Sequence, residues 1–396
     1  MFFPQRETLG FDSRQCTPRL LAAVIHLAGE VHSFERARLM MDLLIGHSLS
    51  AKTIERLTHQ VGQELQARNE TSNWEQEVVV PEVAVVSCDG GRIRTRAAHS
   101  GPGVHEAAWR ETKNASFERM CAPEVAKTDP CESLPDTFRR VAHVAKIAEK
   151  EAFSGISSDG DRDIAPAYAG PERILRTCVA SMADSDDFGV QMSREAERRH
   201  FHEARRRVFI GDGLAWNWSI WRTRFATFTP ILDFIHAIQY VYTAAEAWES
   251  DGPSRWQRYL ELAEAIWQGR VDDVIEALRL ELVTRGWTDE KDISDTDPRR
   301  ALIDAKRYLT DNRTRMDYAR YRREGLPITS SPVESLIKQI NHRVKGTEMF
   351  WLQPEGAEAI LQIRAASLSE DGRLADYLRR RPGHAFVRRS RLALAS

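Results

Sequence analysis

Three acidic residues of this 396-residue chain stand in surroundings that suit chemistry on phosphate groups. Asp89 follows the mostly apolar run Val-Ala-Val-Val-Ser-Cys and precedes two glycines. Asp212 follows Val-Phe-Ile-Gly and precedes Gly213, while Glu334 lies far downstream in Ser-Pro-Val-Glu. Short apolar runs of this kind predict buried strands. The carboxylates are therefore expected at two strand ends and on one helix.

Strand-end carboxylates joined by a helical glutamate match the layout of ribonuclease-H-like nucleases. A phosphodiester carries charge and gains more in the transition state, which a pair of Mg²⁺ ions about 4 Å apart stabilises. We expect Asp89 to bridge two Mg²⁺ ions, or Mn²⁺ in their place, with Asp212 and Glu334 holding one ion each. The glycines beside the aspartates would let a DNA backbone approach. The alternative is that each Asp-Gly pair is an ordinary turn.

The helix expected around Glu334 has a polar and an apolar face. Leu336, Ile337, Ile340 and Val344 share the apolar face. The polar side predicts DNA-phosphate contacts beside a metal ligand, from Lys338, His342, Arg343 and Lys345. The alternative is a surface pair of Glu334 with Lys338, four residues apart.

Basic residues also gather before this helix and at the end of the chain. Arg320, Arg322 and Arg323, with Tyr308, Tyr318 and Tyr321 interleaved, are typical of a nucleic-acid groove. A solvated helix face would look the same. Arg-Arg-Arg at 379–381 and Arg-Arg-Ser-Arg at 388–391 indicate a flexible basic tail, whose contribution to DNA affinity would depend on salt.

Residues 1–70 predict a small helical domain. A Gly-containing break at 46–50 separates two amphipathic helices, which is typical of a helix-turn-helix. Ile54, Leu57 and Val61 share the apolar side of the second helix, so Lys52 and Arg56 would face DNA. Many small helical bundles have the same pattern without binding DNA.

The remaining pattern predicts an α/β fold. The first strand would open into a Gly-rich turn after Asp89, and two short strands, at 107–113 and 116–121, would pair antiparallel with it. A helix at 192–206, the strand before Asp212, a strand at 225–234 and a long helical stretch at 237–323 would follow.

Composition limits the other function classes. The formal net charge is −2, so any DNA contact must come from local patches. Five scattered cysteines without a Cys-x-x-Cys pair argue against a disulfide framework or a zinc site. Without an apolar leader or spanning run, we expect no membrane partner and a cytoplasmic protein, associated with the nucleoid when bound to DNA.

Several motifs together resemble the Kra-type family of bacterial insertion-sequence transposases, which are distantly similar to Mutator-like and hAT-like enzymes. They are Ser-Cys-Asp-Gly-Gly-Arg at 87–92, Trp-Arg-Glu-Thr-Lys at 109–113, Gly-Asp-Gly-Leu-Ala-Trp-Asn-Trp at 211–218, Ile-Leu-Asp-Phe-Ile-His at 231–236 and Gly-Leu-Pro-Ile-Thr-Ser-Ser-Pro-Val-Glu-Ser at 325–335. The segment from Arg343 to Ala365 fits as well. The likeness runs from the first residues to about residue 380.

The resemblance implies a ribonuclease-H-like mixed-sheet core interrupted by a large all-α insertion. It assigns the catalytic acids to Asp89, Asp212 and Glu334, and an accessory Asp-x-x-His element to Asp233 and His236. Family members commonly have Gly-Ser-Gly where this chain has Thr-Ser-Ser at 329–331. The expected organisation is a helical domain at 1–70, the core at 82–239, the insertion at 240–323, the final core helices at 324–380 and the tail at 381–396.

The function implied is that of a DDE transposase. It would bind the terminal inverted repeats of its element as a homo-oligomer on double-stranded DNA, cut there with Mg²⁺, and join the 3′ hydroxyl to target DNA. One alternative is a catalytically decayed transposase that represses by binding element ends. Another is a structure-specific nuclease without strand transfer.

Overall fold

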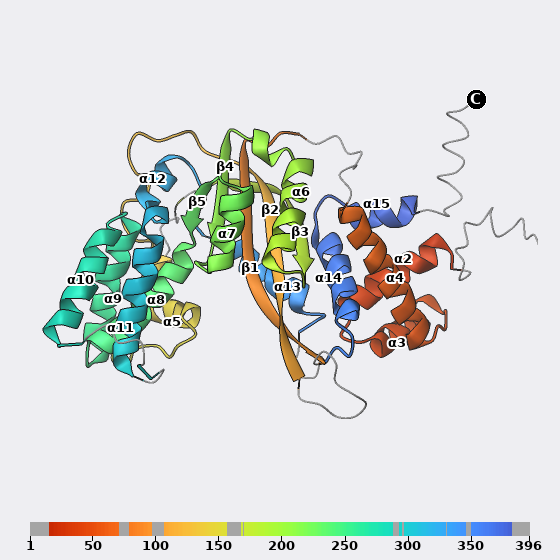
Figure 1. Cartoon of the computed structure of the whole chain (residues 1–396), viewed down its shortest axis with the longest axis horizontal. Coiled ribbons are helices and arrows are strands. Elements are labelled where there is room, and N and C mark those ends of the chain that lie inside the picture. Colours follow the sequence, from red (N-terminus) through yellow and green to blue (C-terminus); the bar gives the residue numbers. More distant parts are fainter. Residues whose placement is uncertain are drawn as a thin grey trace, which may run out of the picture.

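A mixed five-stranded sheet lies at the centre of the chain (Figure 1). The computed structural model describes residues 16–70, 79–96, 107–156, 168, 170–287, 293–294, 297–329, 331–345 and 350–381. The strand order is β3-β2-β1-β4-β5. The strands are β1 (Val83–Arg96), β2 (Ala107–Cys121), β3 (Glu172–Ser181), β4 (Arg206–Gly211) and β5 (Thr229–Leu232). The prediction of an α/β fold with a mixed sheet is therefore confirmed.

The sheet changes direction at β1. Strand β2 pairs antiparallel with both β1 and β3, whereas β4 pairs parallel with both β1 and β5. The first six residues of β1, Val83 to Cys88, are all buried, which is why this run is apolar or small throughout. The centre of the sheet is thus covered on both faces.

Three strand predictions were wrong in detail. Strand β1 does not turn after Asp89 but continues to Arg96, because Gly90 and Gly91 stay paired with β2. The two short strands expected at 107–113 and 116–121 are one strand, and β3 was not predicted at all. The helix expected at 192–206 is α6 (Ser185–Arg198), which ends before β4.

The helices between β2 and α8 lie partly on the sheet and partly against α8. Besides α6 they are α5 (Val141–Ile147) and α7 (Ala215–Arg224), with single 3₁₀ turns at Asp136–Arg139 and Phe201–Glu203. Phe188 and Met192 of α6 and Trp218 and Ile220 of α7 are buried in the main core. The amphipathic pattern of these helices is therefore explained by packing on the sheet.

The long helical stretch forms a bundle at one end of the molecule (Figure 1). It consists of α8 (Phe234–Trp248), α9 (Gly252–Trp267), α10 (Val271–Thr284), α11 (Pro298–Asn312) and α12 (Tyr318–Arg323), with a 3₁₀ turn at Arg313–Arg315. Its first helix starts six residues earlier than the 240 expected for the insertion. Leu278 and Leu309 belong to the same buried cluster as Val85 and Ile210 of the sheet. The bundle and the sheet therefore share one continuous core.

The two ends of the chain pack together. The N-terminal helices are α2 (Pro18–Glu30), α3 (Phe34–Ile45) and α4 (Ala51–Asn69), and the C-terminal ones are α13 (Ser331–Asn341), α14 (Pro354–Leu368) and α15 (Arg373–Arg380). Ile25 and Val61 share a buried cluster with Ile363 and Leu378. In Figure 1, α14 lies between β3 and the N-terminal helices. Residues 16–70 therefore complete their core with the last helices.

The prediction of a flexible basic tail is wrong for its first arginine cluster, at 379–381. Arg379 and Arg380 lie in α15 and both form ion pairs with Asp376. Arg381 is 8% exposed and binds the carboxylate of Glu64. Residues 382–396, including the second arginine cluster, lie outside the described residues. Among the helices that are described, none is long and apolar enough to cross a membrane.

Helices α4 and α14 approach closely at Gly62. A Cβ atom built there would lie 2.5 Å from the backbone of Ala359. Alanine normally stabilises a helix interior by about 1 kcal/mol over glycine. Here Gly62→Ala is expected to lower the free energy of unfolding by about 1–3 kcal/mol, because the helices must separate. Urea denaturation measures the change.

The matched control is Gln63→Ala, the neighbouring exposed position of α4. It should change the free energy of unfolding by no more than about 0.5 kcal/mol. A Gly62→Ala variant as stable as the wild type would show that α4 and α14 do not pack at this distance.

Candidate active site

The two aspartates meet where the parallel pairing of β1 and β4 ends. The last parallel pair is Cys88 with Gly211, so the next residues are Asp89 and Asp212. Neighbouring strands lie about 4.8 Å apart, which brings the two acidic side chains to the same edge of the sheet. The expectation from the sequence that these acids lie together is met by the geometry.

The Asp212 side chain is held by the start of α7. Its Oδ1 accepts hydrogen bonds from the backbone N–H of Leu214 at 2.9 Å and from Nδ2 of Asn217 at 2.5 Å. Burial raises the pKa of Asp212 and outweighs the Leu214 hydrogen bond, and together with the charge of Asp89 it brings the value to about 6. A nearby cation would therefore favour the ionised form of this carboxyl group.

Gly213 allows the chain to turn after Asp212. Its φ is +99°, and a Cβ atom there would lie 2.6 Å from the Tyr308 ring. A Cβ at Gly91 would likewise meet the side chains of Asn341 and Thr112. The interpretation that these two glycines admit a DNA backbone is therefore wrong, because protein side chains fill the space.

The Asp-x-x-His element lies directly beside the two acids. The backbone N–H of Asp233 donates to the Gly211 carbonyl at 2.9 Å, and its Oδ1 caps α8 by accepting from the Ile235 N–H at 3.0 Å. The Nδ1–H of His236 donates to Oδ2 of Asp233 at 3.1 Å. Asp233 is fully buried, whereas His236 reaches a cavity.

His236 carries a positive charge beside the acids. Burial alone would lower the pKa of the imidazole, but the hydrogen bond and charge of Asp233, together with the charges of Asp212 and Asp89, raise it to about 9. Both ring nitrogens are then protonated at neutral pH, so the Nε2–H can donate to an anion. A phosphate oxygen is an anion that suits this donor.

Buried polar atoms without partners surround the acids. Asn114 is fully buried and lies directly opposite Asp89 in the β1–β2 pairing, and neither its Oδ1 nor its Nδ2 has a hydrogen-bond partner among the described residues. The Oδ1 atoms of Asn217 and Asn341 are also buried without a hydrogen-bond partner among the described residues. Buried polar atoms are almost always satisfied by protein, water or an ion. The cluster therefore fits a hydrated ligand.

The donors fit a hard cation such as Mg²⁺. Two carboxylates and the amide oxygen of Asn114 are oxygen ligands, which Mg²⁺ prefers while keeping several waters. No three His, Cys, Asp or Glu side chains within the described ranges converge as a metal site. The third expected acid, Glu334, lies in the first turns of α13, and its side chain is outside the described residues.

Asp89 opens into a cavity of about 610 Å³ with basic walls. Helix α13 contributes Lys338, His342 and Lys345 from one wall, as the polar side of that helix predicts. Helix α5 contributes His143 and Lys146 from another. Asp89 and His236 also line the cavity, with Glu149 as the other acid. Positive side chains thus outnumber acids around Asp89.

The apolar side of α13 is also as expected. Leu336, Ile340 and Val344 are fully buried in a cluster with Ile93 of β1. Because this face is fixed on the sheet, Lys338 and Lys345 remain exposed on the cavity side. The amphipathic pattern therefore determines which residues of α13 face the acids.

Two expected DNA contacts are wrong. Arg322 is 1% exposed, and its guanidinium binds Asp129 and the Trp267 carbonyl. Arg343 is 3% exposed and donates from Nε to the Ala28 carbonyl at 3.0 Å. Burial lowers the pKa of Arg343 to about 10, and its guanidinium lies over Phe34 and Trp351. Both side chains join distant segments of the protein.

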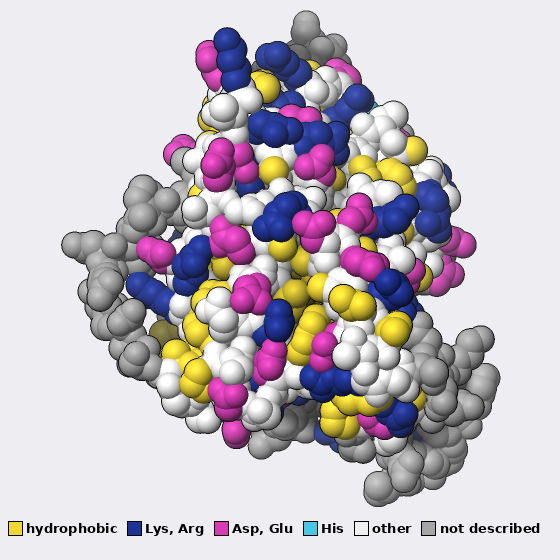
Figure 2. Space-filling model, turned by 90° about the vertical axis from the view of Figure 1, so that its left-hand side faces the viewer, with side chains coloured by type: hydrophobic (Ala, Val, Ile, Leu, Met, Phe, Trp, Pro, Cys, Tyr) yellow, Lys and Arg dark blue, Asp and Glu magenta, His cyan; other side chains and the backbone are white. Residues whose placement is uncertain are grey.

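Two aromatic residues of the expected groove, Tyr318 and Tyr321, are wrong as well. Tyr318 and Tyr321 are fully buried and donate hydrogen bonds to the carbonyls of Leu232 and Pro230. Arg320 is exposed but forms ion pairs with Asp317 and Glu324, and Arg323 is half-buried. On the face at this end of the molecule, Figure 2 shows basic and acidic side chains intermingled.

The N-terminal helices keep the expected exposed bases. Lys52 and Arg56 lie exposed in the first two turns of α4, while Ile54, Leu57 and Val61 are buried. Helix α3 ends at Gly46 in a left-handed conformation, and Ser50 caps α4. In a helix-turn-helix the first residues of the second helix contact bases. DNA binding by Lys52 and Arg56 stays a prediction.

Sequence reasoning missed four residues around the acids. Asn114 could have been found only from the strand register, because it lies opposite Asp89. Asn217 stands in the motif at 211–218, but the motif did not predict a role for it. His143 and Lys146 of α5 carry no motif. The four residues are Asn114, Asn217, His143 and Lys146.

We expect Asn114→Val to separate activity from stability. The change removes two buried polar atoms that lack partners, so the free energy of unfolding should rise by about 1 kcal/mol. Mg²⁺-dependent DNA cleavage should fall by about tenfold to a hundredfold, because an oxygen beside Asp89 is lost. Thermal unfolding and single-turnover cleavage measure the two effects. If Asn114 has only a structural role, the free energy of unfolding and the cleavage rate will fall together.

A scan against protein-family models gives no match to this chain. A search of curated proteins gives none either.

Proposed function

We propose that the chain is a DDE transposase of the Kra type, with a ribonuclease-H-like core. The observation that carries the proposal is the pair Asp89 and Asp212, which lie where the parallel pairing of β1 with β4 ends. Three antiparallel strands followed by two parallel ones, with acids at this point, suit a ribonuclease-H-like sheet. The basic cavity beside Asp89 supports a polyanionic substrate.

The proposed reaction has two steps. A water oxygen attacks the scissile phosphorus at the element end, the bond from phosphorus to the 3′ oxygen breaks, and that oxygen takes a proton to become a 3′ hydroxyl. The 3′ hydroxyl then attacks a phosphorus of target DNA and displaces the 3′ oxygen there. Each step replaces one phosphorus–oxygen bond with another, so no oxidant or energy source is required.

Asp89, Asp212 and Glu334 would hold the metal ions. When bound, two Mg²⁺ ions supply charge that lowers the barrier to attack and departure at phosphorus. Lys338, Lys345 and Lys146 would bind phosphates from the two walls of the cavity. His236, held by Asp233, would donate to a phosphate oxygen near the acids.

The test uses a labelled duplex carrying the repeats that flank the coding region, with a supercoiled plasmid as target. With Mg²⁺ we expect cut ends and covalently joined products, and with EDTA neither. Binding without cutting would contradict the proposed enzyme and support the repressor. Cut ends that never join would contradict transposition and support a nuclease.

A further inference from the structure

A second cavity lies next to the Asp212 segment, between α7 and α11. Its volume is about 380 Å³, and Gly213 forms part of its wall. The hydroxyl of Tyr308, another wall residue, donates to the Asp212 carbonyl at 2.6 Å. The cavity therefore contacts the segment that carries a proposed catalytic acid.

Three arginines and two aspartates line this cavity. Arg307 is already paired with Asp304 at 2.7 Å. Arg222 and Arg315 form no ion pair with any described residue, the Asp311 carboxylate included. Two guanidinium groups thus face the same space without a counter-charge in contact with either.

These two positive charges repel each other. Burial lowers the pKa of Arg315, and the charge of Arg222 lowers it further, against the smaller opposing effects of Tyr321 and Asp311. Like charges held together cost free energy, and a bound anion removes that cost. The pair is therefore prepared for an anionic ligand.

Arg315 is fixed in place by its neighbours. Its guanidinium lies over the Trp218 ring at 4.3 Å, and Nη1 donates to Oδ1 of Asn312 and to the Asp311 carbonyl, both at 3.1 Å. Asn312 is itself 3% exposed and donates to the Tyr308 carbonyl at 2.9 Å. A donor held in this way loses little entropy when it binds a ligand.

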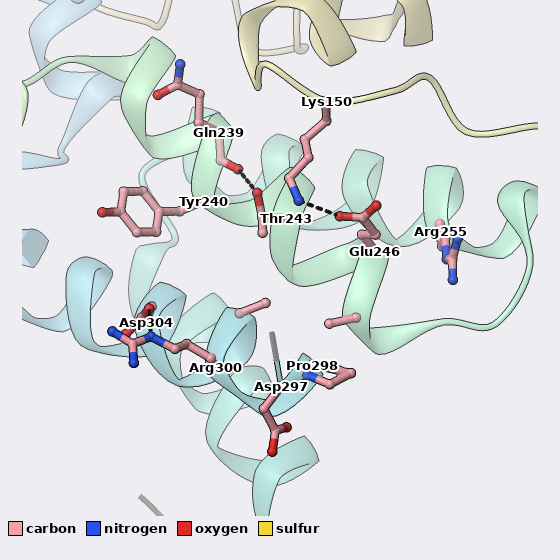
Figure 3. Close-up of a pocket in the computed structure, with 12 residues that line it drawn as sticks. Lys150, Gln239, Tyr240, Thr243, Glu246, Arg255, Asp297, Pro298, Arg300 and Asp304 are labelled. Atoms are coloured by element: carbon pink, nitrogen blue, oxygen red, sulfur yellow. Dashed lines mark hydrogen bonds and ion pairs between the residues drawn. The ribbon is translucent and has the colours of Figure 1, made fainter. Parts of the chain in front are cut away.

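Two neighbouring residues of α8 connect three hollows. Tyr240 stacks on Tyr308 with 3.8 Å between ring centres and lines the second cavity. Tyr240 also lines a groove between α8 and α11, where Figure 3 shows its ring at one end. Gln239 lines that groove and the cavity that contains Asp89. Residues 239 and 240 of α8 therefore link the cavity at Asp89 to the second cavity through the groove.

We propose that Arg222 and Arg315 bind the phosphodiester that neighbours the scissile phosphodiester on the same DNA strand. The inference rests on the proposed function, because it takes DNA as the substrate. The ligand class follows from two guanidiniums without carboxylate partners beside a proposed catalytic acid. Bound in this way, the neighbouring phosphate would fix the scissile phosphate against Asp212.

The first experiment replaces single phosphates near the cut by neutral methylphosphonates. In the wild type, one such replacement should weaken binding of the cut-site duplex by about tenfold. In R222Q and R315Q, the same replacement should have a clearly smaller effect, because one of the two partner charges is already gone. Arg222 is exposed, so R222Q should keep the fold.

The matched control is R224Q. Arg224 is an exposed arginine of the same helix that does not line the cavity. In R224Q, the neutral phosphate should weaken binding of the duplex as much as it does in the wild type. If the neutral phosphate and the arginine replacement weaken binding additively at every position tested, the proposal is overturned, even if the chain cuts DNA normally.

The second experiment separates this inference from the proposed function. Inorganic phosphate should raise the melting temperature of the wild type and R224Q, but not that of R222Q or R315Q. An equal rise in all four proteins would overturn the site. A wild type that neither binds nor cuts element ends would contradict the proposed function. In that case a rise confined to the wild type and R224Q would still support the anion site.

Discussion

Asp212→Asn and Asp89→Asn should each lower the rate of Mg²⁺-dependent DNA cleavage by about a thousandfold, with little change in affinity for element ends. Asparagine keeps the size of the side chain and an oxygen that can accept the Leu214 N–H bond, but it removes the charge that attracts the cation. Metal ions lower such barriers by several kcal/mol, and each 1.36 kcal/mol is a tenfold change in rate. The same loss is expected for Glu334→Gln.

The Asp212 variant should also be more stable than the wild type without metal. Burial and Asp89 raise the pKa of Asp212 to about 6, above its ordinary value of 3.8. A raised carboxyl pKa means that ionisation opposes folding, so the wild type should lose stability as pH rises from about 4 to 6. Asp212→Asn removes that loss, which amounts to at most about 3 kcal/mol at pH 7.

Mg²⁺ should reverse the order of stability. A cation bound between the acids stabilises the folded wild type by mass action, whereas Asp212→Asn lacks one ligand. Melting temperatures with and without Mg²⁺ measure this, alongside single-turnover cleavage and gel-shift binding. Asp273→Asn is the control, because Asp273 is an exposed acid of α10. Normal cleavage by either site variant, or equal stabilisation of both proteins by Mg²⁺, would contradict the site.

The sequence predicted the parts of the site that have a local signature. Short apolar runs before Asp89 and Asp212 indicated buried strands, and the parallel pairing of β1 with β4 brings their ends together. The two-sided pattern of α13 identified Lys338 and Lys345 as cavity residues. In both cases the information lies within about one turn or strand of the residue concerned.

Other features depended on partners far away in the chain. Arg322 looked like a surface base, but its partner Asp129 lies 193 positions earlier. Arg343 binds a carbonyl 315 positions away. The continuation of β1 through Gly90 and Gly91 is determined by pairing with β2, which local propensity does not reveal. Tertiary contacts therefore decided these cases against the local pattern.

Glu195→Gln should lower the free energy of unfolding by about 3–5 kcal/mol, because Glu195 neutralises several buried arginines. Its Oε1 accepts from Arg373 at 2.5 Å and from Arg199 at 3.2 Å, and Oε2 accepts from Arg198 at 3.3 Å. Arg199 and Arg373 are also bound by Asp371. The amide would leave one negative charge against three guanidiniums. Chemical denaturation measures the loss.

The pH dependence of stability should change in the same variant. Burial would raise the pKa of Glu195, but Arg373 and Arg199 outweigh it and lower the value from 4.5 to about 2. The stability supplied by the ionised carboxylate is therefore fully present above about pH 4.5 and is lost as the pH falls towards 2. Glu195→Gln lacks this group, so its stability should fall less steeply over that interval.

Two comparisons identify charge neutralisation as the cause. Glu197→Gln removes an exposed acid of the same helix and should change stability by no more than about 0.5 kcal/mol. Adding Arg373→Met to Glu195→Gln should restore part of the loss, because one uncompensated buried charge disappears with its partner. If the second change instead adds its full cost, the arginines are not held by Glu195. The link that the cluster makes between α6 and α15 would then depend on Asp371 alone.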